Sequence, residues 1–131
     1  MAKPPWQRTS ARRRGYADAM YAGPRAAPRP LHDALEELAQ TLGPDIKLCP
    51  GKTIVPVYRR HVIAQIKPAT RTRIDFGLAL GQLPARGRLI DTGGWKKKDR
   101  TTHRIAVSQA ADLDEELTGW LRQAYELDEE G

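Results

Sequence analysis

A chain of 131 residues, 40% of them hydrophobic and 29% charged, is long enough for one globular domain with a buried core. It has no apolar run of the roughly 20 residues that a membrane span needs, and its first residues lack the apolar centre of a secretory signal. The single cysteine, Cys49, excludes an internal disulfide and suits a reducing compartment. We therefore expect a cytoplasmic protein without a membrane partner.

The charge is unevenly distributed along the chain. Residues 1–108 carry a net charge of +13 and residues 109–131 a net charge of −7, which together give the overall +6. A basic body favours phosphate-rich partners, because binding releases counterions. The acidic end would disfavour nucleic acid locally, or pair with a basic surface on another copy. The alternative is that the asymmetry only keeps a small domain in solution.

Residues 1–30 are predicted to form a basic arm, with seven Lys or Arg, one acid and five prolines. Such a composition cannot bury enough apolar surface to order itself alone. A short helix that docks through Tyr16, Met20 and Tyr21 is compatible with the middle of the arm. We place the folded domain at residues 31–131.

The domain begins with a helix and continues with strands. Leucines at helical spacing predict a helix over residues 31–43, preceded by Pro30 and closed by a glycine. Pro56 places the second strand at an edge or a bulge. The segments that indicate strands are 43–52 (a short edge strand between turns), 53–58, 60–67, 71–80, 87–92 and 103–108.

Residues 112–127 carry a long apolar stripe, which predicts a final helix capped by Ser108 or Asp112. Two amphipathic helices need a surface to cover, and the apolar face of the sheet supplies one. We therefore predict an α+β fold: a two-layer sandwich of an antiparallel sheet of about four to six strands, with an N-terminal and a C-terminal helix on one face. This order of elements is similar to that of frataxin-like domains.

The loop "DTGGWKKKDR", residues 91–100, is the first candidate site. Its Gly-Gly pair can turn backbone N–H groups inward, and the cations around it can surround a phosphate. Trp95 among cations is typical of a loop that stacks a base or docks a partner. The alternative is a hairpin connection with solvated lysines. The candidate residues are Trp95, Lys96, Lys97, Lys98 and Arg100.

The polar face of the sheet is the second candidate site. Strict alternation places Arg73 and Asp75 on the same side of one strand. We expect Lys67, Arg88 and Arg104 on neighbouring strands, which would give a shallow cationic platform where Asp75 orients one arginine. The alternative is an ordinary solvated face of salt bridges. Lys52, after a glycine turn, is a further cation that can point into a cleft between helix and sheet.

The signals for catalysis are weak. The three histidines, His32, His61 and His103, have no partner at metal-ligand spacing, so we expect no metal and no cofactor. No known nucleophile motif surrounds Cys49 or the serines. The sequence favours a binding protein over an enzyme.

Three long segments carry a resemblance: "LGPDIKLCPGKTIVPVYRRHVIAQIKPATRTRIDFGLALG", "GRLIDTGGWKKKDRTTHRIAV" and "WLRQAYEL". They resemble the bacterial family called domain of unknown function 5655, over about residues 16–128. In many relatives this domain follows a small helical domain, and here we expect the basic arm to stand in that place. The resemblance implies the α+β sandwich and identifies no catalytic residue. The positions that match the family are Lys52, Gln65, Lys67, Arg73, Asp75, Gly77, Arg88, Asp91, Gly93, Lys97, Asp99, His103 and Arg104.

Three hypotheses about function follow. The first is non-enzymatic binding of nucleic acid or another polyanion, through Arg12, Arg13 and Arg14 of the arm and the loop Lys96–Arg100. The second, a small-ligand or enzymatic domain, would use the pocket candidates Lys52, Lys67, Arg73, Asp75, Arg88, His103 and Arg104. The third is a protein-interaction module, docking or self-associating through the acidic C-terminal helix or the basic arm.

Overall fold

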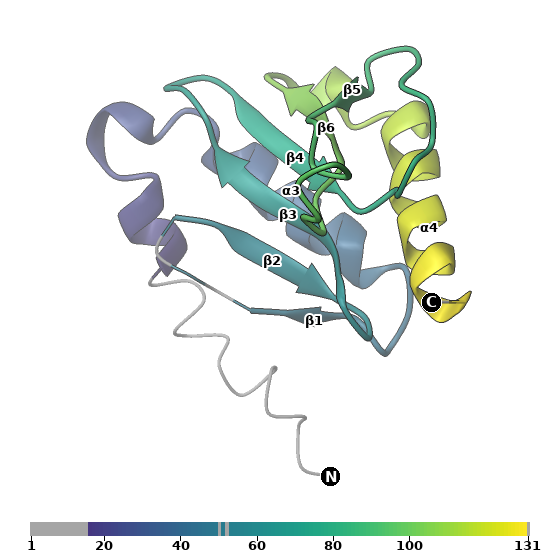
Figure 1. The fold of residues 1–131 in the computed structure, drawn as a ribbon. Coiled ribbons are helices and arrows are strands. Elements are labelled where there is room, and N and C mark those ends of the chain that lie inside the picture. Colours follow the sequence, from purple (N-terminus) through teal and green to yellow (C-terminus); the bar gives the residue numbers. More distant parts are fainter. Residues whose placement is uncertain (1–15, 50, 52, 131) are drawn as a thin grey trace, which may run out of the picture.

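The computed structural model describes residues 16–49, 51 and 53–130, and within these an antiparallel sheet of six strands runs in the order β1-β2-β3-β4-β6-β5 (Figure 1). Arg12, Arg13, Arg14 and Lys52 lie outside the described residues. The strands are β1 (Lys47–Leu48), β2 (Val55–Tyr58), β3 (Val62–Pro68), β4 (Ile74–Leu78), β5 (Ile90–Asp91) and β6 (His103–Val107). Each lies within, or extends by one residue, a segment that the sequence indicates as a strand.

Two long helices accompany the sheet, α3 (Arg29–Gln40) and α4 (Glu115–Glu130). In Figure 1, α3 lies behind the strands and α4 runs along the side of the sheet. Two 3-10 turns, η1 (Gly23–Arg25) and η2 (Ala110–Asp112), precede them. The predicted α+β class, with an N-terminal and a C-terminal helix against an antiparallel sheet, is confirmed; the frataxin-like order stays a prediction.

The strands alternate between a buried and an open face. Ile66, Phe76 and Ile105 are paired across β3, β4 and β6, and all three are fully buried. They join apolar side chains of both long helices, such as Leu35 and Leu121, in one core. The opposite face of these strands carries the polar side chains Gln65, Lys67, Asp75 and Arg104, with Gly77 and Ala106 between them. This face is where the candidate site lies.

The described end of the predicted arm packs onto this core. Residues 16–20 are helical, and Met20 and Tyr21 are buried. The Tyr21 hydroxyl lies 2.8 Å from Nδ1 of His32, whose Nε2 lies 3.2 Å from Oε1 of Glu36. Burial, with the nearby Glu36 carboxylate, raises the pKa of Tyr21, which therefore keeps its proton. The domain boundary at residue 30 stays a prediction.

The predicted cap of the last helix is wrong. The Asp112 carboxylate instead accepts N–H donors of Ser108 and Gln109, and so closes η2. The α-helix begins only at Glu115, and the side chain of Asp114 accepts the Leu117 N–H at its first turn. This bond, aided by Arg88, lowers the pKa of Asp114.

Pro56 lies in β2, between β1 and β3, and the ladder to β3 shifts register just after it, at Val57 and Tyr58. The bulge that Pro56 predicted is thus present, although β1 occupies the edge. Within the described residues, no helix has both the length and the apolar character to cross a membrane.

Candidate anion-binding site

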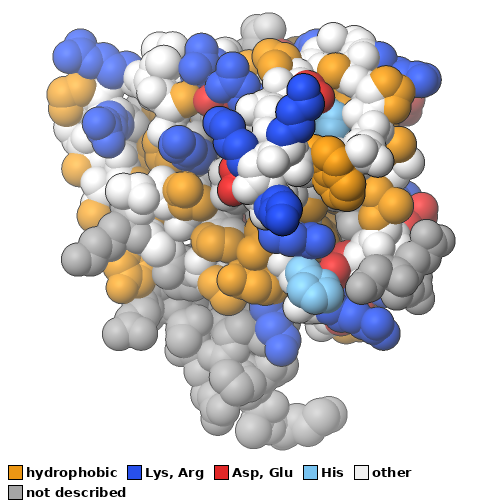
Figure 2. Space-filling model, viewed as in Figure 1, with side chains coloured by type: hydrophobic (Ala, Val, Ile, Leu, Met, Phe, Trp, Pro, Cys, Tyr) orange, Lys and Arg blue, Asp and Glu red, His pale blue; other side chains and the backbone are white. Residues whose placement is uncertain are grey.

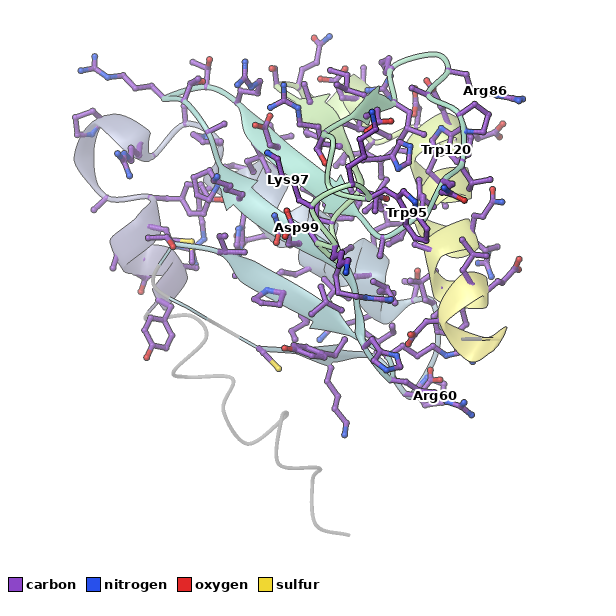
Figure 3. All side chains as sticks on the ribbon, in the orientation of Figure 1. Arg60, Arg86, Trp95, Lys97, Asp99 and Trp120 are labelled. Atoms are coloured by element: carbon purple, nitrogen blue, oxygen red, sulfur yellow. The ribbon has the colours of Figure 1, made fainter. Side chains whose placement is uncertain are left out.

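The loop of residues 92–102, here called the lysine loop, connects β5 to β6 and folds over the open face of the sheet (Figures 1 and 3). Trp95 on this loop is 51% exposed, and Lys96, Lys97 and Lys98 are exposed as well. Figure 3 shows Lys97 over the strands and Trp95 on the side of the loop nearer α4. The loop therefore presents Lys97 on one side and an aromatic ring on the other.

The backbone of the lysine loop is closed by its own hydrogen bonds. The Gly93 N–H donates to Asp91, and the Gly94 N–H to Oγ1 of Thr92. The Asp99 N–H donates to the Gly94 carbonyl at 2.8 Å. The expectation that the Gly-Gly pair turns its N–H groups toward an anion is therefore wrong, because both are already paired. Gly94 serves packing instead, because a Cβ there would overlap the Thr101 carbonyl, whereas Gly93 adopts a left-handed φ of +79°.

A cleft of about 290 Å³ lies between the lysine loop and the open face of the sheet. We call it the sheet-face cleft. The charged residues that line it are Lys67, Asp75, Lys97, Asp99 and Arg104. Gly77 forms part of its floor, and a Cβ there would come within 2.8 Å of Gln65 and Thr101 side-chain carbons. The structure thus brings three of the predicted platform residues, Lys67, Asp75 and Arg104, together with one lysine of the loop.

Asp75 holds two arginines at the edge of this cleft. Its Oδ1 accepts a hydrogen bond from Nε of Arg73, and its Oδ2 accepts one from Nη1 of Arg104, both at 3.1 Å. The sequence predicted that Asp75 orients one arginine. Both arginine side chains are about 40% exposed, and a guanidinium has five N–H donors, so each can still donate to a ligand.

Several cations around the cleft are not neutralised. Among the described residues, no carboxylate lies within ion-pair distance of Lys67 or of Lys96, Lys97 and Lys98. Figure 2 shows Lys and Arg side chains gathered over this face, with few acidic side chains among them. The arrangement can bind an anion through several charged donors at once.

Arg88 does not belong to this surface. Its Nε donates to Glu116 at 3.2 Å and its Nη2 to Asp114 at 2.6 Å, both at the start of α4. Its Nη1 is buried without a hydrogen bond and lies 3.8 Å from an Asp112 carboxylate oxygen, close enough for an ion pair only. The acidic C-terminal segment therefore neutralises this arginine.

His103 is placed away from Asp75. Its ring is fully buried and its Cα pairs with that of Leu78, on the core side of the sheet. Nε2 lies 2.7 Å from the Leu83 carbonyl, which can only accept, so Nε2 carries a proton and donates. Nδ1 lies 2.8 Å from Oγ1 of Thr102, which also accepts the Leu80 N–H. His103 thus fixes the segment after β4.

Arg100 and Asp128 tie the base of the lysine loop to α4. Arg100 donates to the Val62 carbonyl through Nε and Nη2, and its Nη2 lies 3.6 Å from Oδ1 of Asp128. The Asp128 side chain is only 1% exposed and also accepts the backbone N–H groups of Arg60 and His61. Burial alone would raise the pKa of Asp128, but these donors and the His61 ring outweigh it and lower the pKa.

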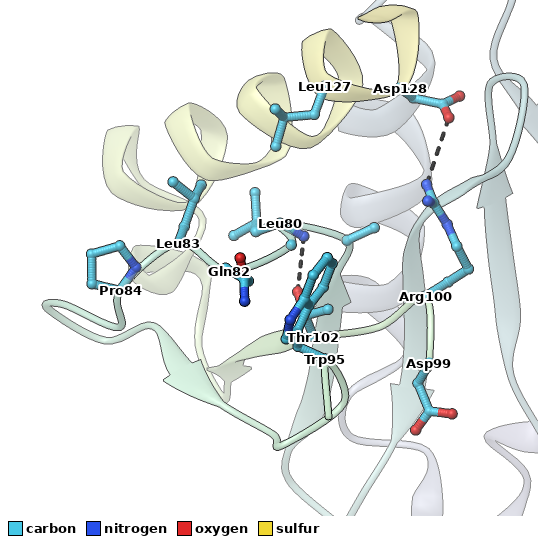
Figure 4. A pocket seen from close by; sticks show the side chains of 12 residues that line it. Leu80, Gln82, Leu83, Pro84, Trp95, Asp99, Arg100, Thr102, Leu127 and Asp128 are labelled. Atoms are coloured by element: carbon cyan, nitrogen blue, oxygen red, sulfur yellow. Dashed lines mark hydrogen bonds and ion pairs between the residues drawn. The ribbon is translucent and has the colours of Figure 1, made fainter. Parts of the chain in front are cut away.

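A second and larger cleft, of about 470 Å³, lies on the other side of the lysine loop (Figure 4). We call it the Trp95 cleft. Its apolar lining consists mainly of Leu80, Leu83, Pro84, Trp95 and Leu127, with the Arg100–Asp128 pair at one end. Sequence reasoning missed Asp128 and Leu127, because both lie on a helix whose pattern indicates only a core stripe and a charged face. No group of three or more His, Cys, Asp or Glu suited to a metal occurs among the described residues.

Comparison with known proteins gives a family. No curated protein and no solved structure matches the chain significantly. The family described as Domain of unknown function (DUF5655) matches residues 17–128, which include every strand and both clefts. The chain therefore belongs to the family of domain of unknown function 5655.

Proposed function

We propose that the protein binds a phosphate-rich polyanion, nucleic acid above all, through the lysine loop and the open face of the sheet. One observation carries the proposal: Lys97 of the lysine loop lies in one cleft with Lys67 and Arg104 of the sheet. No described carboxylate pairs with Lys97 or with its exposed neighbours Lys96 and Lys98. Convergent, exposed and unneutralised cations attract phosphate oxygens and release counterions on binding.

The rest of the charge distribution defines the extent of this surface. Lys67, Arg73 and Arg104 extend it across the strands, whereas Arg88 is withdrawn from it by the acids of α4. Arg100 contributes in part, because Asp128 lies 3.6 Å from it. Arg12, Arg13 and Arg14 belong to the proposal as a second contact from the arm. With no motif that reads base edges, recognition is largely independent of sequence.

A second candidate function is binding of a small anionic ligand in the sheet-face cleft. The observation that favours it is the convergence of Lys67, Lys97 and Arg104 on a cleft of about 290 Å³, where Asp75 orients Arg104 and Asp99 supplies a further carboxylate. Such a mixture of a few charged groups on a concave surface fixes the orientation of a ligand. His103 does not line this cleft, and Lys52 lies outside the described residues.

The test measures the salt dependence of binding to a labelled single-stranded oligonucleotide by fluorescence anisotropy. We compare the wild type with the triple variant Lys96→Gln, Lys97→Gln, Lys98→Gln. For single strands, each phosphate contact contributes about 0.7 to the slope of log K against log salt, so losing three contacts should reduce the slope by about 2. The matched control removes three exposed cations elsewhere, through Lys47→Gln, Arg86→Gln and Arg122→Gln.

The control decides between a site and a mere net charge. If both triple variants lose affinity equally, the lysine loop is not the binding surface. An affinity that does not change with salt concentration, or an absence of binding at about 50 mM salt, also contradicts the proposal. The small-ligand candidate instead predicts saturable thermal stabilisation by inorganic pyrophosphate, which Arg104→Gln abolishes. Light scattering at the same salt concentrations detects self-association, which should dissolve as salt rises if it is electrostatic.

A further inference from the structure

The Trp95 cleft is an apolar hollow beside a strongly cationic loop. The indole of Trp95 forms one wall, and Leu127 of α4 lies across from it (Figure 4). About half of the Trp95 surface and 37% of Leu127 remain exposed. Large apolar side chains of this kind are usually buried, so an occupant that covers them gains hydrophobic free energy.

The walls of this cleft are held in place by hydrogen bonds. The Leu80 N–H donates to Oγ1 of Thr102 at 2.9 Å, and His103 fixes the Leu83 carbonyl. On the opposite side, the Lys98 N–H donates to the Trp95 carbonyl at 3.1 Å. The cleft therefore exists before any ligand arrives, which reduces the entropy lost on binding.

Polar groups are available at the margins of the cleft. The exposed Gln82 amide offers both a donor and an acceptor, and the guanidinium of Arg100 lies at one end. An apolar slot with an aromatic wall and a few polar groups suits a flat ring whose edge forms hydrogen bonds. A nucleobase has this shape and chemistry.

The charge beside the cleft distinguishes a nucleotide from other aromatic occupants. Lys96, Lys97 and Lys98 directly follow Trp95, and no described carboxylate pairs with them. A base in the cleft is joined through its sugar to phosphates, which these lysines complement. An aromatic peptide side chain would need acidic neighbours to gain the same attraction.

We propose that the Trp95 cleft takes one unpaired nucleobase, with the adjoining phosphates on the lysines of the same loop. The proposal deepens the proposed function and rests on it: the polyanion is single-stranded nucleic acid. A duplex keeps its bases stacked and paired, and cannot insert one without being opened. Preference for single strands then comes from stacking, which tolerates any base.

The test compares three labelled ligands of equal length by anisotropy at one salt concentration: a single-stranded oligonucleotide, the same backbone with abasic sites throughout, and a duplex. The single strand should bind between about 5-fold and about 150-fold more tightly than the abasic strand, the range for stacking of one base. Trp95→Ala should lower the affinity for the single strand to the affinity for the abasic strand. Trp95→Phe should restore part of the difference in affinity between the single strand and the abasic strand. Ile90 is an exposed apolar residue outside the cleft, so Ile90→Ala should leave all three affinities unchanged.

The two proposals fail in different ways. If all three ligands bind equally and lose affinity in the lysine-loop triple variant, phosphate binding stands and the base site is overturned. If none binds at low salt, both are overturned. If an acidic peptide containing tryptophan competes for the cleft while the single strand and the abasic strand bind equally, the occupant is a protein and the base site is again overturned.

Discussion

Asp128 is the buried carboxylate that connects α4, the turn between β2 and β3, and the base of the lysine loop, and we expect Asp128→Asn to destabilise the fold. The carboxylate accepts the Arg60 N–H at 2.6 Å, the His61 N–H at 3.0 Å and Nδ1 of His61 at 2.7 Å. Hydrogen bonds to a charged group contribute roughly 1.5–3 kcal/mol each. Both backbone N–H groups donate to Oδ2, so the one acceptor oxygen of asparagine can keep these two bonds in weaker form, whereas the bond to Nδ1 of His61 is lost.

The expected loss is therefore about 2–4 kcal/mol in the free energy of unfolding. With a urea dependence of about 1–3 kcal/mol per molar, the unfolding midpoint should fall by roughly 1–2 M. The matched control is Glu126→Gln, which removes one negative charge from an exposed position on the same helix. It should change stability by no more than about 0.5 kcal/mol.

The pH dependence of the same variant gives a second measurement. The pKa of Asp128 is lowered on folding, so its contribution to stability is complete above the ordinary carboxyl pKa of about 4 and is lost as pH falls through the lower folded value. The stability difference between wild type and Asp128→Asn should therefore shrink as the pH falls below about 4. A loss under about 0.5 kcal/mol at pH 7, or a difference that grows as the pH falls below about 4, refutes the reasoning.

Two further predictions concern the cations around the site. Arg88→Gln should lower the free energy of unfolding, measured in urea, by about 1–3 kcal/mol, because the acids at the start of α4 lose their partner. Its affinity for the oligonucleotide should equal that of the exposed control Arg86→Gln. Weaker binding than this control would mean that Arg88 belongs to the binding surface. Lys98 has a left-handed φ of +61°, which glycine adopts without strain. In thermal unfolding, Lys98→Gly should therefore be about 1 kcal/mol more stable than Lys97→Gly. Equal stability of the two variants would contradict the left-handed conformation.

The elements of the fold were predictable because their signals are local. Leucine spacing marks α3, and strict alternation separates Phe76 from Asp75 on opposite faces of β4. The start of α4 was not predictable, since the carboxylates of Asp112 and Asp114 compete to cap the segment and only packing decides which one closes η2. The candidate site was predictable in part: Asp75 with its arginines follows from alternation within a strand and register between neighbours.

What the chain alone determined is thus its class, its helices and strands, its family and the side of the sheet that carries charge, because each depends on periodicity or on long motifs. Tertiary structure decided which cations remain available. Arg88 meets Glu116 across 28 residues, and His61 meets Asp128 across 67, contacts that no local pattern contains. The lysine loop crosses the open face because the hydrogen bonds that hold it there come from parts of the chain brought together only by folding.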